Sequence, residues 1–446
     1  MSLDSNVTLN INLSDEVSLQ EVVVSAKKDN DNLTKAAMGT EVLNMKMAAK
    51  IPVIFGEKDL VKTIQILPGV KSNGEGGNGF TVRGGSTDQN LILLDEAPVY
   101  NASHLLGMFS TFNSDAIKDA TIIKGNSPAQ FGGRLSSVLD VKMKEGNNKD
   151  YQVSGGIGLI SSRLTIEGPV QKERSSFIIS GRRTYADLIA KLSPDFRDMS
   201  LYFYDLNAKA NLEINNKNRI FFSGYFGKDD FGVSNLFGSK WGNATGTLRW
   251  NSVLSSKLFS NTSLIYSNYD FNVGFNSDGS NTNFNSHIRD LNLKQDFSLY
   301  AKAKNTIRFG FNVIHHTITP TIAEGTNITD DKKSRKGLEN AVYVSNYYKA
   351  SDKLSLDCGL RFSSYSILGG DTYNIYQNNQ LIDSIKLEEG KIGKTYYNLE
   401  PRLSMNYRLN NTSSLKIGYA RNTQNLHLMS NSTGRQPYRP VDRQQL

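Results

Sequence analysis

Residues 79–100, GFTVRGGSTDQNLILLDEAPVY, combine a glycine-rich turn with two charged residues that could bind an anion or transfer a proton, Arg83 and Asp95. A strand-end aspartate more often caps a turn than performs catalysis. Ser86 follows the turn, but no histidine is placed beside it by the sequence, and no nucleophile elbow surrounds it. We therefore expect no catalytic residue, no enzyme activity and no cofactor.

Two further patterns could bind a nucleotide or a metal. Residues 74–79, GEGGNG, satisfy the G-x-G-x-x-G spacing, but a dinucleotide loop must leave a strand and open a helix, whereas this one leads into a strand pattern. His315 and His316 are adjacent in another strand pattern, so their side chains point to opposite faces and cannot share an ion. His104 and His287 have no ligand partner nearby in sequence. The sequence predicts neither a nucleotide site nor a metal site.

Composition narrows the class of protein. The chain has 446 residues with 51 Lys and Arg against 43 Asp and Glu, a net charge of +8. The basic residues are scattered among acidic ones, so we expect no nucleic-acid partner, while the excess favours an anionic solute or lipopolysaccharide. The single cysteine, Cys358, allows no intrachain disulfide. No stretch approaches the ~18 apolar residues of a membrane helix, but a membrane strand alternates its two faces and would escape that test.

A two-residue period runs through the second half of the chain and is clearest at residues 201–214. Every second side chain on one face is apolar: Tyr202, Tyr204, Leu206, Ala208, Ala210, Leu212 and Ile214. From Asp205 onward the alternate face is polar. A strand of this length suits a tilted membrane strand of ~9–11 residues better than a soluble sandwich strand of ~5–6 residues.

The connections between these strands are sorted by length. Short polar links are expected at 215–218, 255–257, 303–305, 350–353 and 410–413, and long ones at about 184–200, 228–243, 274–285, 318–338 and 368–395. Such alternation is typical of an up-and-down membrane β-barrel, with a soluble β-rich module as the alternative. Roughly thirteen strands are predicted. Because bacterial barrels have even strand numbers, we expect the barrel in this chain to be truncated.

The first half is mixed and glycine-rich, and it predicts a small α+β domain before the barrel. The chain resembles TonB-dependent outer-membrane receptors of the type common in Bacteroidota, through motifs in the family's order: LPGV (67–70), FTVRGG (80–85), LILLDEAPV (91–99), the segment 117–146 and the barrel start VSGGIGL. The resemblance implies three parts, which are an N-terminal extended segment (1–37), a plug domain (38–147) and a partial transmembrane β-barrel (148–446).

The resemblance also implies which plug residues hold the plug in the barrel. Candidates for this lock and its turns are Arg83, Gly84, Gly85, Asp95 and Arg134. In the family, plug arginines pair with barrel acids, so Arg83 and Arg134 are expected to do so. The chain departs from the family at Glu96, where glycine is usual, and this departure puts the local turn geometry in doubt.

Ahead of the plug, a β-branched segment precedes a polar stretch and could add as a strand to a partner's sheet. It matches the family's TonB box at Glu21, Val22, Val23 and Val24. An edge strand of an upstream domain is the alternative for this segment.

The implied function is TonB-dependent active transport of a scarce or large solute, such as a siderophore, cobalamin, a glycan or a peptide. The alternative is a passive outer-membrane porin or structural barrel without energy coupling. The implied partners are TonB with its inner-membrane energising complex, outer-membrane lipid and lipopolysaccharide, and a surface lipoprotein. The implied location is the outer membrane of a Gram-negative cell, with the plug and the N-terminus facing the periplasm.

Overall fold

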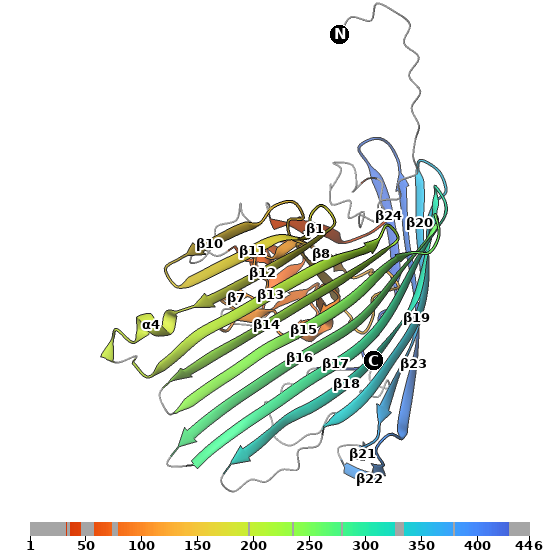
Figure 1. Ribbon diagram of the computed structural model, residues 1–446. Helices are drawn as coiled ribbons and strands as arrows, with labels where there is room; N and C mark the ends of the chain where they lie inside the picture. Colours follow the sequence, from red (N-terminus) through yellow and green to blue (C-terminus); the bar gives the residue numbers. More distant parts are fainter. Residues whose placement is uncertain are drawn as a thin grey trace, which may run out of the picture.

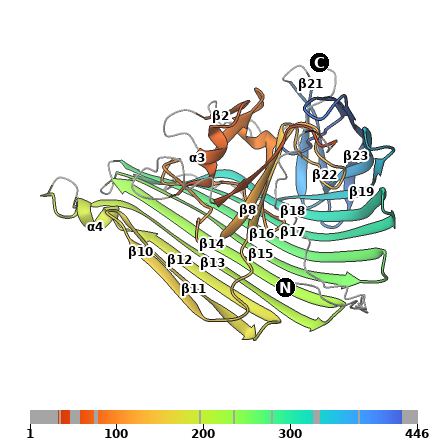
Figure 2. The same cartoon turned by 90° about the horizontal axis from the view of Figure 1, so that it is seen from above.

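A computed structural model describes most of the chain. The described residues are 33, 36–45, 58–73, 79–194, 197–233, 236–277, 280–325, 334–377 and 380–427. Within them, a five-stranded sheet in the order β1-β8-β9-β4-β5 lies on the concave side of a curved thirteen-stranded sheet (Figures 1 and 2). An α+β plug domain followed by an up-and-down membrane β-barrel is therefore confirmed.

The plug is built from short elements around an apolar core. Its elements are β1 (Thr40–Asn44), α3 (Leu60–Gln65), β2 (Val70–Ser72), β3 (Phe80–Val82), β4 (Asn90–Leu94), β5 (Ala97–Pro98), β6 (Ser103–His104), β7 (Phe109–Ser110), β8 (Ile117–Lys124) and β9 (Ser137–Met143). Helix α3 begins at Asp59, whose carboxylate accepts a hydrogen bond from the Lys62 backbone N–H at 3.0 Å, as an N-cap residue does. No helix among the described residues has the length and apolarity to cross a bilayer.

The large sheet starts at Gln152, and each strand pairs antiparallel with the next one in the sheet. Its strands are β10 (Gln152–Ile157), β11 (Ser161–Gln171), β12 (Ser175–Thr184), β13 (Met199–Asn215), β14 (Asn218–Val233), β15 (Phe237–Val253), β16 (Leu258–Ser277), β17 (Ser280–Lys302), β18 (Asn305–Gly325), β19 (Arg335–Lys349), β20 (Leu354–Leu368), β23 (Ile392–Arg408) and β24 (Ser414–Ala420). A short helix, α4 (Ala186–Ala190), precedes β13, and a separate hairpin of β21 (Asp371–Gln377) and β22 (Gln380–Leu387) precedes β23.

The short links lie where the sequence predicts them, and the long links at 184–200 and 368–395 also separate strands of the large sheet, but the long links expected at 228–243 and 274–285 are wrong. Strand β14 extends to Val233 and β15 starts at Phe237, so the expected loop at 228–243 is mostly strand. The expected loop at 274–285 is likewise occupied by the ends of β16 and β17. A strand that projects beyond the lipid is wetted on both faces and loses its polar and apolar alternation, which is why the sequence pattern ends before the strand does.

The large sheet has the reverse of a soluble protein's polarity. Along β13 the polar side chains Asp205, Asn207, Lys209 and Asn211 are buried beneath the plug. On the other face, Leu206 and Ile214 have 48% and 56% of their surface exposed. A continuous apolar outer surface with a polar interior is what a lipid-embedded barrel requires.

We expect Leu206→Arg to destabilise the full-length protein in lipid vesicles by ~2–4 kcal/mol if this site lies near the bilayer midplane. Ile214→Arg is the matched control on the same face of the same strand, beside the 215–218 turn, where the cost should be ~0–1 kcal/mol. Urea unfolding of vesicle-inserted protein measures both values. Equal tolerance at the two sites would indicate that β13 faces water instead of lipid.

Candidate functional site

The turn between β4 and β5 presents two acidic residues to the barrel wall. Leu94 pairs with Ala97, so Asp95 and Glu96 form a two-residue turn, and their φ angles are 44° and 75°. Asparagine, aspartate and glycine are favoured where both turn residues have positive φ. The Glu96 position therefore favours the glycine usual in related plugs, and the turn keeps its shape without it.

Asp95 joins the plug to β13. One of its carboxylate oxygens accepts a hydrogen bond from the Met143 N–H at 3.1 Å, and the other lies 3.0 Å from Lys209 Nζ. Lys209 is only 4% exposed and also donates to the Met143 carbonyl at 3.1 Å. Asp95 is therefore both a turn residue and one half of a buried ion pair between plug and barrel.

Glu96 reaches two neighbouring cations on other strands. Its carboxylate lies 3.4 Å from Arg249 on β15 and 3.8 Å from Lys294 on β17. Burial would raise the pKa of Glu96, but the charges of Lys294 and Arg249 outweigh it and hold that pKa below its usual value. The residue is therefore an anion at neutral pH.

A third contact is centred on His104 at the end of β6. Its Nδ1 lies 2.7 Å from Asp229, which also accepts the Leu105 N–H at 2.8 Å, and its Nε2 lies 3.5 Å from Asp205. The ring stacks on Phe203 with centroids 4.2 Å apart. Burial lowers the pKa of His104, but the carboxylates of Asp229 and Asp205 more than offset this and raise it above its usual value. The His104 ring thus ties the plug to β13 and β14.

Arg182 on β12 completes that cluster. Its guanidinium lies 2.6 Å from Asp205, and it donates to the Ser110 carbonyl of the plug at 2.7 Å. The side chains of Arg182 and Asp205 are 2% and 0% exposed. Such a fully desolvated pair is costly to break from one side, because the remaining charge has no water to solvate it.

Two barrel arginines hold a plug loop on the opposite side of the lumen. Arg402 donates to the Ser127 carbonyl at 2.9 Å, and Arg361 donates to the Ala129 carbonyl at 3.5 Å. A Cβ atom at Gly132 would lie 2.4 Å from Arg361 Nε, so a larger residue there would have to displace the arginine side chain. Glu400 balances the cluster at 2.8 Å from Arg402.

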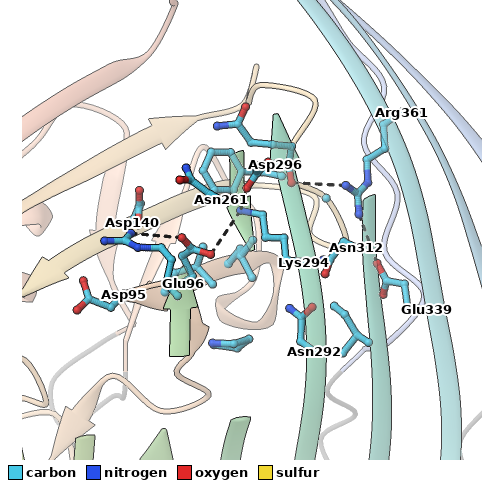
Figure 3. Close-up of a pocket in the computed structure, with 18 of the residues that line it drawn as sticks. Asp95, Glu96, Asp140, Asn261, Asn292, Lys294, Asp296, Asn312, Glu339 and Arg361 are labelled. Atoms are coloured by element: carbon cyan, nitrogen blue, oxygen red, sulfur yellow. Dashed lines mark hydrogen bonds and ion pairs between the residues drawn. The ribbon is translucent and has the colours of Figure 1, made fainter. Parts of the chain in front are cut away.

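A cavity of about 230 Å³ lies between the Asp95 and Glu96 turn and the barrel wall (Figure 3). Strands β15 to β20 line it with Arg249, Asn261, Asn292, Lys294, Asp296, Asn312, Ile314, Glu339 and Arg361. Within it, Glu96 points toward Lys294, which is also 2.9 Å from Asp296 (Figure 3). The arrangement can bind polar groups and water.

The structure separates the lock residues expected from sequence. Arg83 is exposed, and its guanidinium lies over the plug glycine Gly125, where a Cβ would be 2.9 Å from Nη1. Gly84 has a φ of 82°, which favours glycine. At Gly85 a Cβ would lie 2.7 Å from the Ser136 Oγ. These three residues shape the plug's own turn, whereas Asp95 contacts the barrel.

Arg134 lies near the barrel acid Glu339, but among the described residues it forms no direct ion pair with a carboxylate. It donates to the Gly133 carbonyl at 2.8 Å, and its positive charge opposes the rise that burial and Asp290 cause in the pKa of Tyr100. The pairing of Arg83 and Arg134 with barrel acids stays a prediction. The expected TonB box, residues 21–24, lies outside the described residues.

Sequence reasoning missed the roles of His104 and Glu96 and did not identify their barrel partners. His104 had no ligand partner nearby in sequence, because Asp229 is 125 residues away. One sequence feature could have indicated these barrel partners, which is the presence of charged residues such as Asp205 and Lys209 on the polar face of a membrane-type strand. Charges placed there require partners inside the lumen.

Comparisons with known proteins agree with this architecture. The model described as TonB-dependent Receptor Plug Domain matches residues 51–137, and the model described as TonB dependent receptor-like, beta-barrel matches residues 177–440. No curated protein matches the chain.

Solved structures share the fold at low identity. A ferric enterobactin receptor mutant from Pseudomonas aeruginosa is 15% identical with a TM-score of 0.64, over 87% of this chain and 62% of that one. The siderophore receptor PirA from Acinetobacter baumannii is 14% identical with a TM-score of 0.65, over 90% of this chain and 62% of that one. The chain thus spans about 62% of the length of these receptors. With a plug model and a barrel model that covers more than half of its residues, the chain belongs to the TonB-dependent receptor family, whose members are outer-membrane proteins.

Proposed function

We propose that this protein is an active transporter that moves a scarce or large solute across the outer membrane with energy supplied through TonB. The observation that carries the proposal is the plug itself, which lies on the lumenal face of the barrel sheet and is held there largely by ion pairs and hydrogen bonds. Water entering the lumen lowers the cost of breaking such contacts, and their geometry restores the same partners afterwards. A plug held in this way can be released and reseated.

The proposed cycle uses no covalent chemistry. Solute binds on the outer side, between the loops and the plug, and the segment at residues 21–24 then adds as a strand to the TonB sheet in the periplasm. Pulling on this segment displaces part of the plug, and the solute passes. The tight links, such as 215–218, lie at the periplasmic end in this orientation, together with the N-terminus.

The solute class is proposed from the similar structures and from the charge of the chain. Those structures are described as a ferric enterobactin receptor, a siderophore receptor and a copper transporter, which supports a metal complex as the first candidate. Cobalamin, glycans and peptides are the other candidates, because outer loops that choose solutes vary most within a fold. Contact with lipopolysaccharide and with a surface lipoprotein belongs to the same proposal.

Uptake by Gram-negative cells that produce the full-length protein tests this function. Cells are given ferric enterobactin, cobalamin and an oligosaccharide, each radiolabelled, with TonB present or deleted. We expect one of these solutes to bind in both strains and to accumulate only when TonB is present. Equal accumulation in the two strains would instead identify a passive porin.

A further inference from the structure

Apolar contact between plug and barrel is concentrated at β13 and β14. Among the described residues, the fully buried barrel side chains that join the plug's hydrophobic clusters are Tyr225, in the main plug core, and Phe203, which packs with Leu105 and Phe109. The His104 ring lies directly against Phe203. On this side, therefore, the ion pairs are embedded in packed apolar side chains.

The side facing β15 to β20 is different, because it carries the 230 Å³ cavity and a polar lining. The carboxamide oxygens of Asn292 and Asn312 are buried at this cavity without a hydrogen-bond partner among the described residues. Polar walls and this volume suit several water molecules, each of which needs only about 30 Å³. We call the interface between the plug and the barrel the plug seat, and we call the part of it that faces β15 to β20 the wet side.

Glu96 is a charged plug side chain that reaches two strands of the wet side, where Tyr100 of the plug also donates a hydrogen bond to Asp290 on β17 at 2.5 Å. The φ of 75° at Glu96 is a conformation in which glycine is far less strained than glutamate. What the glutamate provides in return is contact with Arg249 and Lys294, on two different strands of the wet side. Its backbone position therefore disfavours glutamate, while its electrostatic surroundings favour it.

We propose that Glu96 is a positioning residue that pins the plug against β15 and β17, and that the wet side is where the seat opens when the plug moves. The β13 and β14 side then stays docked as the fixed edge. The idea that solute passes at this opening rests on the proposed transport function, but plug retention by Glu96 does not.

Conductance of the full-length protein in planar bilayers tests the pin. Glu96→Gln keeps the strained turn and removes the charge, and Glu96→Gly removes both the strain and the charge. We expect the open probability to rise by about tenfold or more in both variants, because each removes the Glu96 carboxylate from two partly buried cations, Arg249 and Lys294. If Glu96 served only the turn, the glycine variant would hold the plug as well as the unaltered protein, and the proposal would be wrong.

Glu173 supplies the matched control. It also has positive φ, 64°, but it is exposed in the turn between β11 and β12. Glu173→Gln and Glu173→Gly repeat the same chemical changes away from the plug, and neither should alter conductance. A rise in these controls equal to that at Glu96 would also overturn the proposal.

Thiol labelling tests which side opens. In a Cys358→Ser background, Asn312→Cys reports the wet side, and Ser180→Cys reports the β12 side, where Ser180 accepts a hydrogen bond from Asn113 at 3.0 Å. A charged methanethiosulfonate reagent should label the Asn312→Cys site about tenfold faster when Glu96→Gln is added, and the Ser180→Cys site at an unchanged rate. Equal acceleration at both sites, or none at either, would contradict an opening on the wet side.

These measurements need neither TonB nor a transported solute. If the Glu96 variants leak but the unaltered protein accumulates no solute, the role of Glu96 in holding the plug is supported and the transport function is contradicted. If the unaltered protein transports solute with TonB but the Glu96 variants do not leak, the transport function is supported and the role of Glu96 in holding the plug is contradicted.

Discussion

Arg182→Met is expected to weaken the docking of the plug against β12 and β13. It leaves the Asp205 carboxylate, which is 0% exposed, with His104 at 3.5 Å and without its 2.6 Å guanidinium partner. The Ser110 carbonyl of the plug also loses a hydrogen bond. Removing one partner of a buried ion pair costs ~3–5 kcal/mol, because the other charge remains desolvated.

Urea titration of pore opening in planar bilayers measures this effect in the full-length protein. With a urea slope of roughly 1–3 kcal/mol per molar, the midpoint for opening should fall by about 1 M or more. Arg183→Met is the matched control on the opposite face of the same strand. Arg183 is 48% exposed and lies 3.7 Å from Asp187, so its loss should cost only ~0–1 kcal/mol. Equal midpoints for the two variants would show that the buried cluster does not hold the plug.

Val23→Pro is expected to abolish TonB-dependent accumulation of solute while solute binding at the outer surface stays nearly unchanged. Proline removes the backbone N–H that strand addition to the TonB sheet would use, and its fixed φ resists the extended pairing. Outer-surface binding uses other parts of the chain. Uptake and binding by cells producing the full-length protein provide the two readouts.

Asn30→Pro makes the same backbone change beyond the expected box, within the polar stretch that follows it. It should leave accumulation intact. The affinity of the full-length protein for the TonB C-terminal domain should fall for Val23→Pro alone. Unaltered affinity in that variant would remove the box from residues 21–24 and favour the edge-strand alternative.

Strand type and the direction of each face could be predicted from sequence because alternation is a local property. Leu206 and Asn207 differ in polarity as neighbours, and a pleated backbone sends neighbours to opposite faces whatever surrounds them. The tight links were predictable for the same reason, since a turn depends on a few adjacent residues. The strand extensions around Val233 and Phe237 were not, because outside lipid neither face must be apolar.

The lock was only partly predictable. The motif around Asp95 indicated a plug residue held by polar contacts, and Asp95 contacts Lys209. The Arg83 guanidinium, from the same reasoning, lies over plug glycines, and its pairing with a barrel acid stays a prediction. A motif gives the type of residue at a position. It does not give the direction in which a long side chain leaves a turn.

Composition and periodicity by themselves determined that this chain forms a lipid-facing sheet with a polar interior, because each depends only on residues near in sequence. The tertiary structure alone decided which charges meet: Lys209 with Asp95, Asp229 with His104, and Arg249 and Lys294 with Glu96. These partners lie more than a hundred residues apart, and their pairing depends on strand register and on how the plug is rotated in its seat. An ion pair acts through space over a few ångströms, and no sequence period records that distance.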